Sequence, residues 1–198
     1  MHVLITGGTG FIGQALCAAL LQAGHTLSVL TRDPARARSQ VPPAARVLAS
    51  LDEARDVEAV VNLAGEPLMA GRWNTTRKAA FRASRLDTTR ALIGWMARQS
   101  VRPRVLVSGS AIGYYGPRGD EALDESAAPG DDFAAHLCRD WETEAMQAEG
   151  LVKFTIRHRS DITTTMRLMS DGEAWNMTSI QNIKGRNLET LIYAQRLG

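Results

Sequence analysis

The stretch that decides the fold reads His2-Val3-Leu4-Ile5-Thr6-Gly7-Gly8-Thr9-Gly10-Phe11-Ile12-Gly13. Residues 2–6 are an apolar run that includes β-branched side chains, which is typical of a buried strand. Glycines dominate residues 7–13, and from Gln14 to Ala23 apolar side chains recur at helical spacing. A glycine-rich turn that joins a strand to a helix is the context in which a dinucleotide-binding fingerprint is credible.

Each glycine of this turn has a predicted task. Gly7 permits the tight turn, Gly10 lets the backbone approach a pyrophosphate, and Gly13 lets the helix pack close to the strand. The free N–H groups at the start of the helix then face the phosphates. We therefore predict a cofactor site that includes Gly7, Gly10, Phe11, Ile12 and Gly13, with a purely structural turn as the alternative.

Composition sets the class of protein. The chain has 198 residues, of which 44% are hydrophobic and 22% charged, as is ordinary for a soluble α/β domain. The net charge of +2 gives no electrostatic case for nucleic acid or for an acidic membrane surface. Cys17 and Cys138 stand alone on expected helices, so they are interpreted as reduced core residues and not as a disulfide or metal site. No signal peptide and no run of transmembrane length is recognised, so a cytoplasmic location is expected.

Strand-like and helix-like segments alternate along the chain. Further strands are expected over residues 26–31, 45–49, 57–65, 104–108 and 151–156, and further helices over 34–40, 77–99 and 133–148. This alternation predicts right-handed βαβ units and a Rossmann-type, doubly wound parallel sheet.

Two strand ends carry further cofactor candidates. Thr31 and Arg32 close the second strand, where an acidic residue would hold the ribose hydroxyls of NAD. An arginine at this place suits a 2′-phosphate, so NADP is the expected cofactor and NAD is the alternative. Leu63, Ala64 and Gly65 end the fourth strand, and the small residues there leave room for a cofactor across the sheet edge.

Several motifs together carry a family resemblance over residues 1 to about 150. They are Leu4 to Gly13, Val61-Asn62-Leu63-Ala64-Gly65-Glu66-Pro67, Gly71-Arg72-Trp73-Asn74, Val107-Ser108-Gly109-Ser110-Ala111-Ile112-Gly113-Tyr114-Tyr115-Gly116, Asp131-Asp132-Phe133 and Cys138-Arg139-Asp140-Trp141-Glu142. This part of the chain resembles the extended short-chain dehydrogenase/reductase superfamily. Within it, the segment looks like the NAD(P)-binding, sugar-nucleotide-epimerase-like group whose substrate is unassigned.

The resemblance implies a Rossmann fold, a bound NADP or NAD, and a substrate beside the nicotinamide. Ser110 matches the superfamily's catalytic serine. The superfamily's tyrosine acid/base and its lysine, however, fall on Ala134 and Cys138, and neither side chain can replace them. Tyr114 and Tyr115, in the long loop over residues 112–132, are the candidates for supplying a phenol.

The tail departs from the family from Val152 onward. Residues 163–170 and 174–180 are expected to form a β-hairpin about residues 170–173, and residues 187–197 a short amphipathic helix. We therefore expect an NAD(P)-binding domain over residues 1–157 and a C-terminal extension of unknown role over residues 158–198.

These patterns predict an NADP(H)-binding, epimerase- or oxidoreductase-like protein that acts on an unassigned small polar substrate. The missing tyrosine–lysine pair predicts weak or no turnover by the superfamily's usual chemistry. Two alternatives stay open: a non-catalytic nucleotide-binding or assembly protein, and a truncated or rearranged family member without the substrate lobe. A homo-oligomer is compatible with the sequence, whereas a nucleic-acid or membrane partner is not expected.

Overall fold

The computed structural model describes residues 1–69, 71–148, 151–156, 167–170, 173–182 and 190–196. Its strands are β1 His2–Thr6, β2 Thr26–Leu30, β3 Arg46–Leu48, β4 Ala59–Asn62, β5 Val105–Ser108, β6 Leu151–Ile156, β7 Arg167–Ser170, β8 Glu173–Asn182 and β9 Thr190–Arg196. Its helices are α1 Phe11–Gln22, α2 Pro34–Ala37, α3 Thr75–Ala97 and α4 Phe133–Met146, with short 3₁₀ turns η1 Leu51–Glu53 and η2 Ile112–Tyr115.

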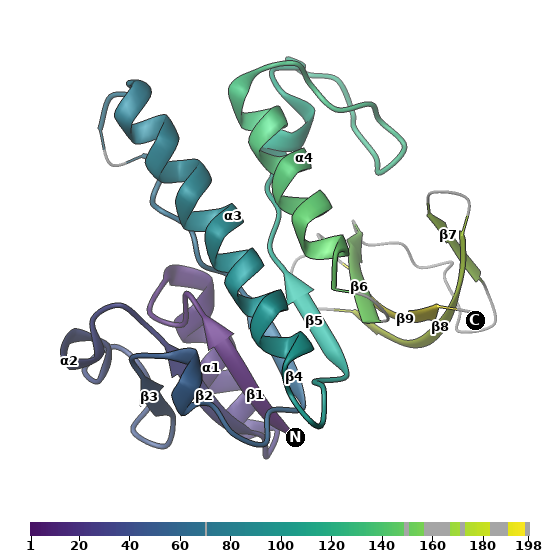
Figure 1. Cartoon of the computed structure of the whole chain (residues 1–198). Helices are drawn as coiled ribbons and strands as arrows, with labels where there is room; N and C mark the ends of the chain where they lie inside the picture. Colours follow the sequence, from purple (N-terminus) through teal and green to yellow (C-terminus); the bar gives the residue numbers. More distant parts are fainter. Residues whose placement is uncertain (70, 149–150, 157–166, 171–172, 183–189, 197–198) are drawn as a thin grey trace.

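All of these strands belong to one sheet, in the order β3-β2-β1-β4-β5-β6-β9-β8-β7 (Figure 1). Strands β1 to β6 pair in parallel, while β9, β8 and β7 continue the sheet in antiparallel pairing. The chain runs outward from β1 through β2 to β3 and then crosses to β4 on the other side of β1, which creates a topological switch point beside β1. The predicted Rossmann-type parallel sheet is confirmed.

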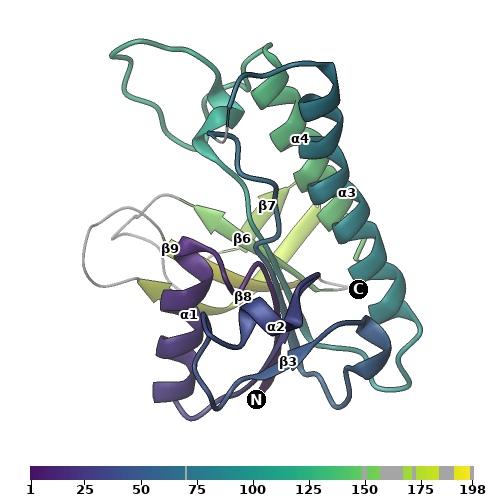
Figure 2. The same cartoon turned by 90° about the vertical axis from the view of Figure 1, so that its left-hand side faces the viewer.

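Helices cover both faces of the parallel part of the sheet. Alternate residues of β1 point to opposite faces, and Leu4 packs with Leu92 of α3, whereas Ile5 packs with Cys17 of α1. Helices α3 and α4 lie side by side on the first face, and α1 lies on the opposite one (Figure 2). Leu4 and Ile5 are fully buried, so each contributes ~1.5–3 kcal/mol to stability by burial alone. Both predicted core cysteines are free and buried.

The tail corrects one expectation. The predicted hairpin is confirmed in its described part, because β7 pairs with β8 from Arg167↔Asn176 to Ser170↔Glu173. The predicted helix over residues 187–197 is wrong: residues 190–196 form β9, which pairs with β6 on one side and β8 on the other. The segment Thr-Leu-Ile-Tyr suits either a helix or a strand, and backbone pairing with two neighbouring strands decides between them. The domain division at residues 157/158 stays a prediction.

Candidate functional site

The glycine-rich turn after β1 has no room for a side chain at Gly7 or at Gly13. Gly7 adopts a φ of +70°, and a Cβ there would lie 2.4 Å from the carbonyl oxygen of Leu63. A Cβ on Gly13 would lie 2.2 Å from the carbonyl oxygen of Gly7, inside any permitted contact distance. The turn is closed by the Gly10 N–H, which donates to the Gly7 carbonyl at 2.9 Å. The turn therefore brings α1 into direct backbone contact with the end of β1.

The first turn of α1 also differs from those of the other helices. Asp33, Asn74 and Asp132 each accept a backbone N–H with a side-chain oxygen at the start of α2, α3 and α4. At α1 the N-cap is Gly10, which has no side chain to accept such a bond. The N–H groups of this turn are thus available to an anion, and the helix dipole favours a negative charge there.

The predicted cofactor residues share one edge of the sheet. Leu30, Thr6, Asn62 and Ser108 are neighbours across β2, β1, β4 and β5, and the candidates follow directly after these strand ends. Since adjacent strands lie ~4.8 Å apart, Ser110 stands roughly 10 Å along the edge from the glycine-rich turn. Two side chains of the turn itself are exposed at this edge, Phe11 at 96% and Ile12 at 66%.

An ion pair crosses the end of β1. The guanidinium of Arg32, which follows β2, lies 3.8 Å from the carboxylate of Glu66, which follows β4. The Arg32 side chain is 90% exposed, so this pair is wide and weak, worth ~0–1 kcal/mol. A stronger anion at this edge can therefore compete for Arg32.

A buried polar network holds the strand ends together beneath the edge. Asn62 is fully buried; its side-chain oxygen accepts from the Thr6 hydroxyl at 2.7 Å, and its amide donates to the Thr89 hydroxyl at 2.8 Å. Thr89 also accepts from the Trp141 indole at 3.1 Å and donates to the Arg85 carbonyl at 2.7 Å. The network links β1 and β4 to α3 and α4, so it holds the carboxyl ends of these two strands in place beneath the candidate site.

Arg85 lies under the end of β4. Its guanidinium packs over the Trp141 ring at 5.3 Å from the centroid, and it donates to the carbonyls of Phe81 and Glu66 at 3.3 Å each. A Cβ on Gly65 would come within 2.8 Å of this guanidinium, so a larger residue there would require the Arg85 side chain to shift. Burial lowers the pKa of Arg85, although Cys138 and Glu66 oppose that shift.

Ser110 bonds to a residue that the sequence did not single out. Its hydroxyl donates to the carboxylate of Glu142 on α4. Burial raises the pKa of Glu142, while the hydrogen bond from Ser110 acts in the opposite direction. The only sequence signal for this residue was its place in the Trp141-Glu142 motif of the resemblance.

The two candidate tyrosines lie on η2. Their rings meet edge to face, with centroids 5.2 Å apart, and both are half-buried. The long loop after them closes on itself, because the Gly130 N–H donates to the Tyr114 carbonyl at 2.9 Å and Arg118 donates to the Ala128 carbonyl at 3.0 Å. Ser110 is bonded to a carboxylate, and the roles of Tyr114 and Tyr115 stay predictions.

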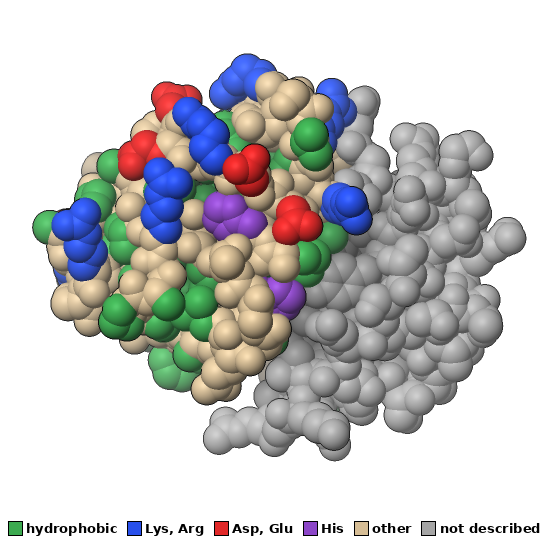
Figure 3. All heavy atoms as spheres, turned by 90° about the horizontal axis from the view of Figure 1, so that it is seen from below, with side chains coloured by type: hydrophobic (Ala, Val, Ile, Leu, Met, Phe, Trp, Pro, Cys, Tyr) green, Lys and Arg blue, Asp and Glu red, His purple; other side chains and the backbone are tan. Residues whose placement is uncertain are grey.

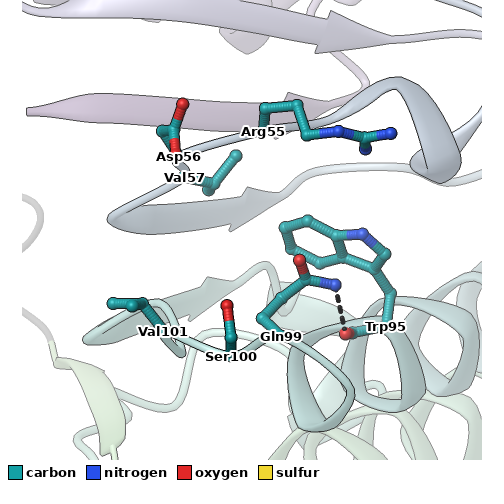
Figure 4. A pocket seen from close by; sticks show the side chains of 7 residues that line it. All are labelled: Arg55, Asp56, Val57, Trp95, Gln99, Ser100 and Val101. Atoms are coloured by element: carbon teal, nitrogen blue, oxygen red, sulfur yellow. Dashed lines mark hydrogen bonds between the residues drawn. The ribbon is translucent and has the colours of Figure 1, made fainter.

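A surface pocket lies at the amino ends of the strands, opposite to the carboxyl ends that carry the candidate cofactor site. It has a volume of about 150 Å³ and is lined by Arg55, Asp56, Val57, Trp95, Gln99, Ser100 and Val101 (Figure 4). These residues precede β4 and β5 or end α3, so they lie at the amino ends of the strands. On the face seen from below, basic and acidic side chains are interspersed (Figure 3).

The described part of the chain lacks two features that would indicate other functions. No helix there is long and apolar enough to cross a membrane. No group of three or more His, Cys, Asp or Glu side chains there is arranged to hold a metal ion.

Comparison with known proteins connects this site to a family. The model of the NAD dependent epimerase/dehydratase family matches residues 3–160. An epimerase family protein SDR39U1 homolog from the chloroplast of Arabidopsis thaliana is 36% identical over 166 residues, which cover 79% of this chain and 47% of the relative. The epimerase family protein Mb2239 of Mycobacterium bovis is 38% identical over 156 residues, which cover 74% of this chain and 48% of the relative.

A solved structure agrees with these matches. This is the crystal structure of the human epimerase family protein SDR39U1 (isoform 2) with NADPH. It is 34% identical in sequence with a TM-score of 0.62, and the match covers 73% of this chain and 48% of the human chain. The chain thus spans about half the length of the relatives that it matches. Because the family model covers most of the sequence and the relatives exceed 30% identity over more than two thirds of it, the chain belongs to the NAD dependent epimerase/dehydratase family.

Proposed function

We propose that the chain binds NADP(H) along the carboxyl edge of its sheet and presents the nicotinamide to a small polar substrate above β4 and β5. The proposal rests on the order of groups along that edge. They are Arg32 after β2, the glycine-rich turn after β1, Ala64 and Gly65 after β4, and Ser110 after β5. This order suits a dinucleotide that lies across the switch point with its pyrophosphate on α1.

The residues at the site suit that cofactor. The uncapped first turn of α1 offers N–H donors to the pyrophosphate, and Gly10 keeps the approach free of a side chain. Arg32 stands on the adenosine side, where a guanidinium can pair with a 2′-phosphate. The NADPH in the human SDR39U1 structure supports the same assignment.

Arg32 should set the preference for the phosphorylated cofactor. A charge-assisted contact to the 2′-phosphate is worth ~1.5–3 kcal/mol, or roughly tenfold or more in affinity. We expect the parent to bind NADPH at least about tenfold more tightly than NADH, and Arg32→Ala to lose that preference while binding NADH as before. Fluorescence titration of both proteins with both cofactors measures this. Equal affinities in the parent would remove Arg32 from the site.

Glu66 should oppose cofactor binding. Its carboxylate pairs with Arg32 across the end of β1 and adds negative charge beside the phosphates. We expect Glu66→Gln to bind NADPH up to about fivefold more tightly, in line with a surface pair worth ~1 kcal/mol or less. Adding Glu66→Gln to Arg32→Ala should raise the affinity for NADPH less than adding it to the parent, because no Arg32 is then present for Glu66 to compete for. A calorimetric titration at low salt resolves the difference; a Glu66→Gln variant that binds more weakly would contradict this arrangement.

The expected chemistry is slow by the superfamily's usual route. Ala134 offers no proton and Cys138 no positive charge at the two positions that carry the tyrosine and the lysine in that route. A positioned acid usually contributes ~10²–10⁴-fold in rate. The second candidate function, a non-catalytic nucleotide-binding protein, is favoured by this same pair of residues. Hydride transfer from bound NADPH to added carbonyl compounds distinguishes the two functions.

A further inference from the structure

One face of α4 runs along the segment that follows β5. Ala134, Cys138 and Glu142 are spaced by four residues, so they occupy three successive turns of that face. A Cβ on Gly113 would lie 3.2 Å from the Cβ of Ala134. The Cys138 thiol donates a weak hydrogen bond to the Ala111 carbonyl at 3.7 Å.

Glu142 lies on the third turn of this face of α4. The Glu142 carboxylate accepts the hydroxyl of Ser110. Ser110 is exposed at the cofactor edge, whereas Glu142 is half-buried behind it. The hydroxyl therefore stands between the carboxyl group and the space above β5. Burial raises the pKa of Cys138, so its thiol keeps its proton at neutral pH and supplies no charge.

We propose that Ser110 and Glu142 form a hydroxyl–carboxyl relay that gives a proton to, or takes one from, the reacting oxygen of the substrate, in place of a tyrosine–lysine pair. The inference rests on the proposed function, since it requires a nicotinamide at this edge. Ser110 is the group that touches the substrate, and Glu142 acts through it.

In the direction of reduction, the step delivers a hydride and a proton to a carbonyl group of the substrate. A hydride leaves the reduced nicotinamide and forms a C–H bond at the carbonyl carbon, whose C=O π electrons move to oxygen. In this direction Glu142 starts protonated and donates its hydrogen to the Ser110 oxygen, which leaves the Ser110 hydroxyl hydrogen free for the substrate. The substrate oxygen takes that hydrogen as a proton, and Ser110 takes a proton from the Glu142 carboxyl. The products are an alcohol, the oxidised nicotinamide and a Glu142 carboxylate, which regains its proton from water. The reverse sequence oxidises an alcohol, as an epimerase requires.

The surroundings of Glu142 raise its pKa above the ordinary value of a glutamate. Its pKa is raised by burial, and the hydrogen bond from Ser110 reduces that shift without cancelling it. The charged groups that face this part of α4 from α3 are engaged: Arg82 pairs with Asp140 at 2.7 Å, Arg90 pairs with Glu144, and Arg85 is held by two carbonyls. On α4 itself, Cys138 lies one turn away as a thiol.

Hydride transfer to a simple aldehyde tests the relay. NADPH-loaded protein is mixed with excess 4-nitrobenzaldehyde, and the loss of NADPH absorbance is followed between pH 5 and 9. We expect the parent rate to fall as the pH rises through the pKa of Glu142. Glu142→Gln and Ser110→Ala should lower the rate by ~10²–10⁴-fold and remove this pH dependence. Glu142→Asp, which keeps a carboxyl, should retain it at a reduced rate.

Matched variants separate the relay from a structural effect. Glu144→Gln, two residues along the same helix, should leave both the rate and its pH profile unchanged. If Tyr114→Phe abolishes turnover while Glu142→Gln does not, the relay is overturned in favour of the phenol. A parent that binds NADPH but transfers no hydride at any pH also overturns it.

An infrared titration of the free protein gives a readout without turnover. The carbonyl stretch of one protonated carboxyl should persist above the ordinary titration range of glutamate, and Glu142→Gln should delete it. Ser110→Ala should move its titration to higher pH, since that hydroxyl lowers the pKa. A band that is unchanged in Glu142→Gln would contradict the relay. A parent that fails to bind NADPH in a fluorescence titration would instead contradict the proposed function, so the two failures are distinguishable.

Discussion

Gly13→Ala should unfold or severely destabilise the protein, although it adds a single methyl group. The new Cβ would lie 2.2 Å from the Gly7 carbonyl oxygen and 2.7 Å from the Gly8 Cα. Both are backbone atoms of the turn, so no side chain can move aside, and α1 would have to shift away from β1. Overpacking in a well-packed interior typically costs ~1–3 kcal/mol, and we expect this variant to reach or exceed the upper end. Urea denaturation followed by circular dichroism measures the loss.

Two other glycines provide matched controls. Gly24 has a φ of +78° with nothing within 4 Å of an added Cβ, so Gly24→Ala carries only the left-handed backbone strain of ~1–2 kcal/mol. Gly10→Ala places its Cβ 3.2 Å from the Gly7 oxygen, a tight but adjustable contact. That variant should fold and yet bind NADPH more weakly, because its methyl group occupies the approach of the pyrophosphate. Gly13→Ala with parental stability would show that the turn is looser than the structure has it.

The contrast among these glycines explains what the sequence could predict. Gly13 belongs to a local pattern in which strand, turn and helix follow within thirteen residues, so spacing alone predicts its close approach to Gly7. The close approach of Gly7 to Leu63 involves the end of another strand and has no such local signal. The parallel sheet follows from the alternation of strands and helices in the same way. Residues 190–196 carry no comparable local signal. Their strand depends on pairing with β8, the preceding strand, and with β6, which comes before both β7 and β8 in the sequence. Periodicity alone favours a helix there.

The candidate site divides along the same line. The sequence predicts Arg32 because it follows a strand end, and parallel strands bring their carboxyl ends to one edge. It predicts Ser110 through the resemblance, which matches this residue to the superfamily's catalytic serine. Glu142 and Asn62 were not predicted, because their roles depend on which helix face meets which strand end. The resemblance aligns Ala134 and Cys138 with the tyrosine and lysine positions of the superfamily, and the structure places both on the face of α4 that meets the segment after β5. The structure adds that the next turn of this face carries the carboxylate that bonds Ser110.

Asn62→Asp should be strongly destabilising at neutral pH, although the two side chains have nearly the same shape. Asn62 donates its amide hydrogen to Thr89, whose own hydrogen is directed to the Arg85 carbonyl. A carboxylate has no hydrogen to donate, so two oxygens would face each other in a fully buried site. An uncompensated buried charge typically costs ~3–5 kcal/mol, and we expect a loss of that size at pH 8.

Lowering the pH should recover much of this loss. A protonated carboxyl can donate to Thr89 and still accept from Thr6, which restores two of the three hydrogen bonds of the Asn62 side chain. It has no second hydrogen for the Ser108 hydroxyl, to which the amide donates at 3.4 Å. Burial raises the folded-state pKa of the introduced carboxyl above the ~3.9 of the unfolded chain, so its stabilising contribution is present below that value and is lost as the pH rises through the folded-state pKa. Urea denaturation at pH 5 and pH 8 should therefore show a larger difference in the free energy of unfolding between parent and Asn62→Asp at pH 8.

Asn62→Ala, which leaves a cavity and an unpaired Thr6 hydroxyl, should be destabilised by about 2–4 kcal/mol with no such pH dependence. An equal loss in Asn62→Asp at both pH values would mean that water reaches Asn62, and that the end of β4 is not sealed beneath the site.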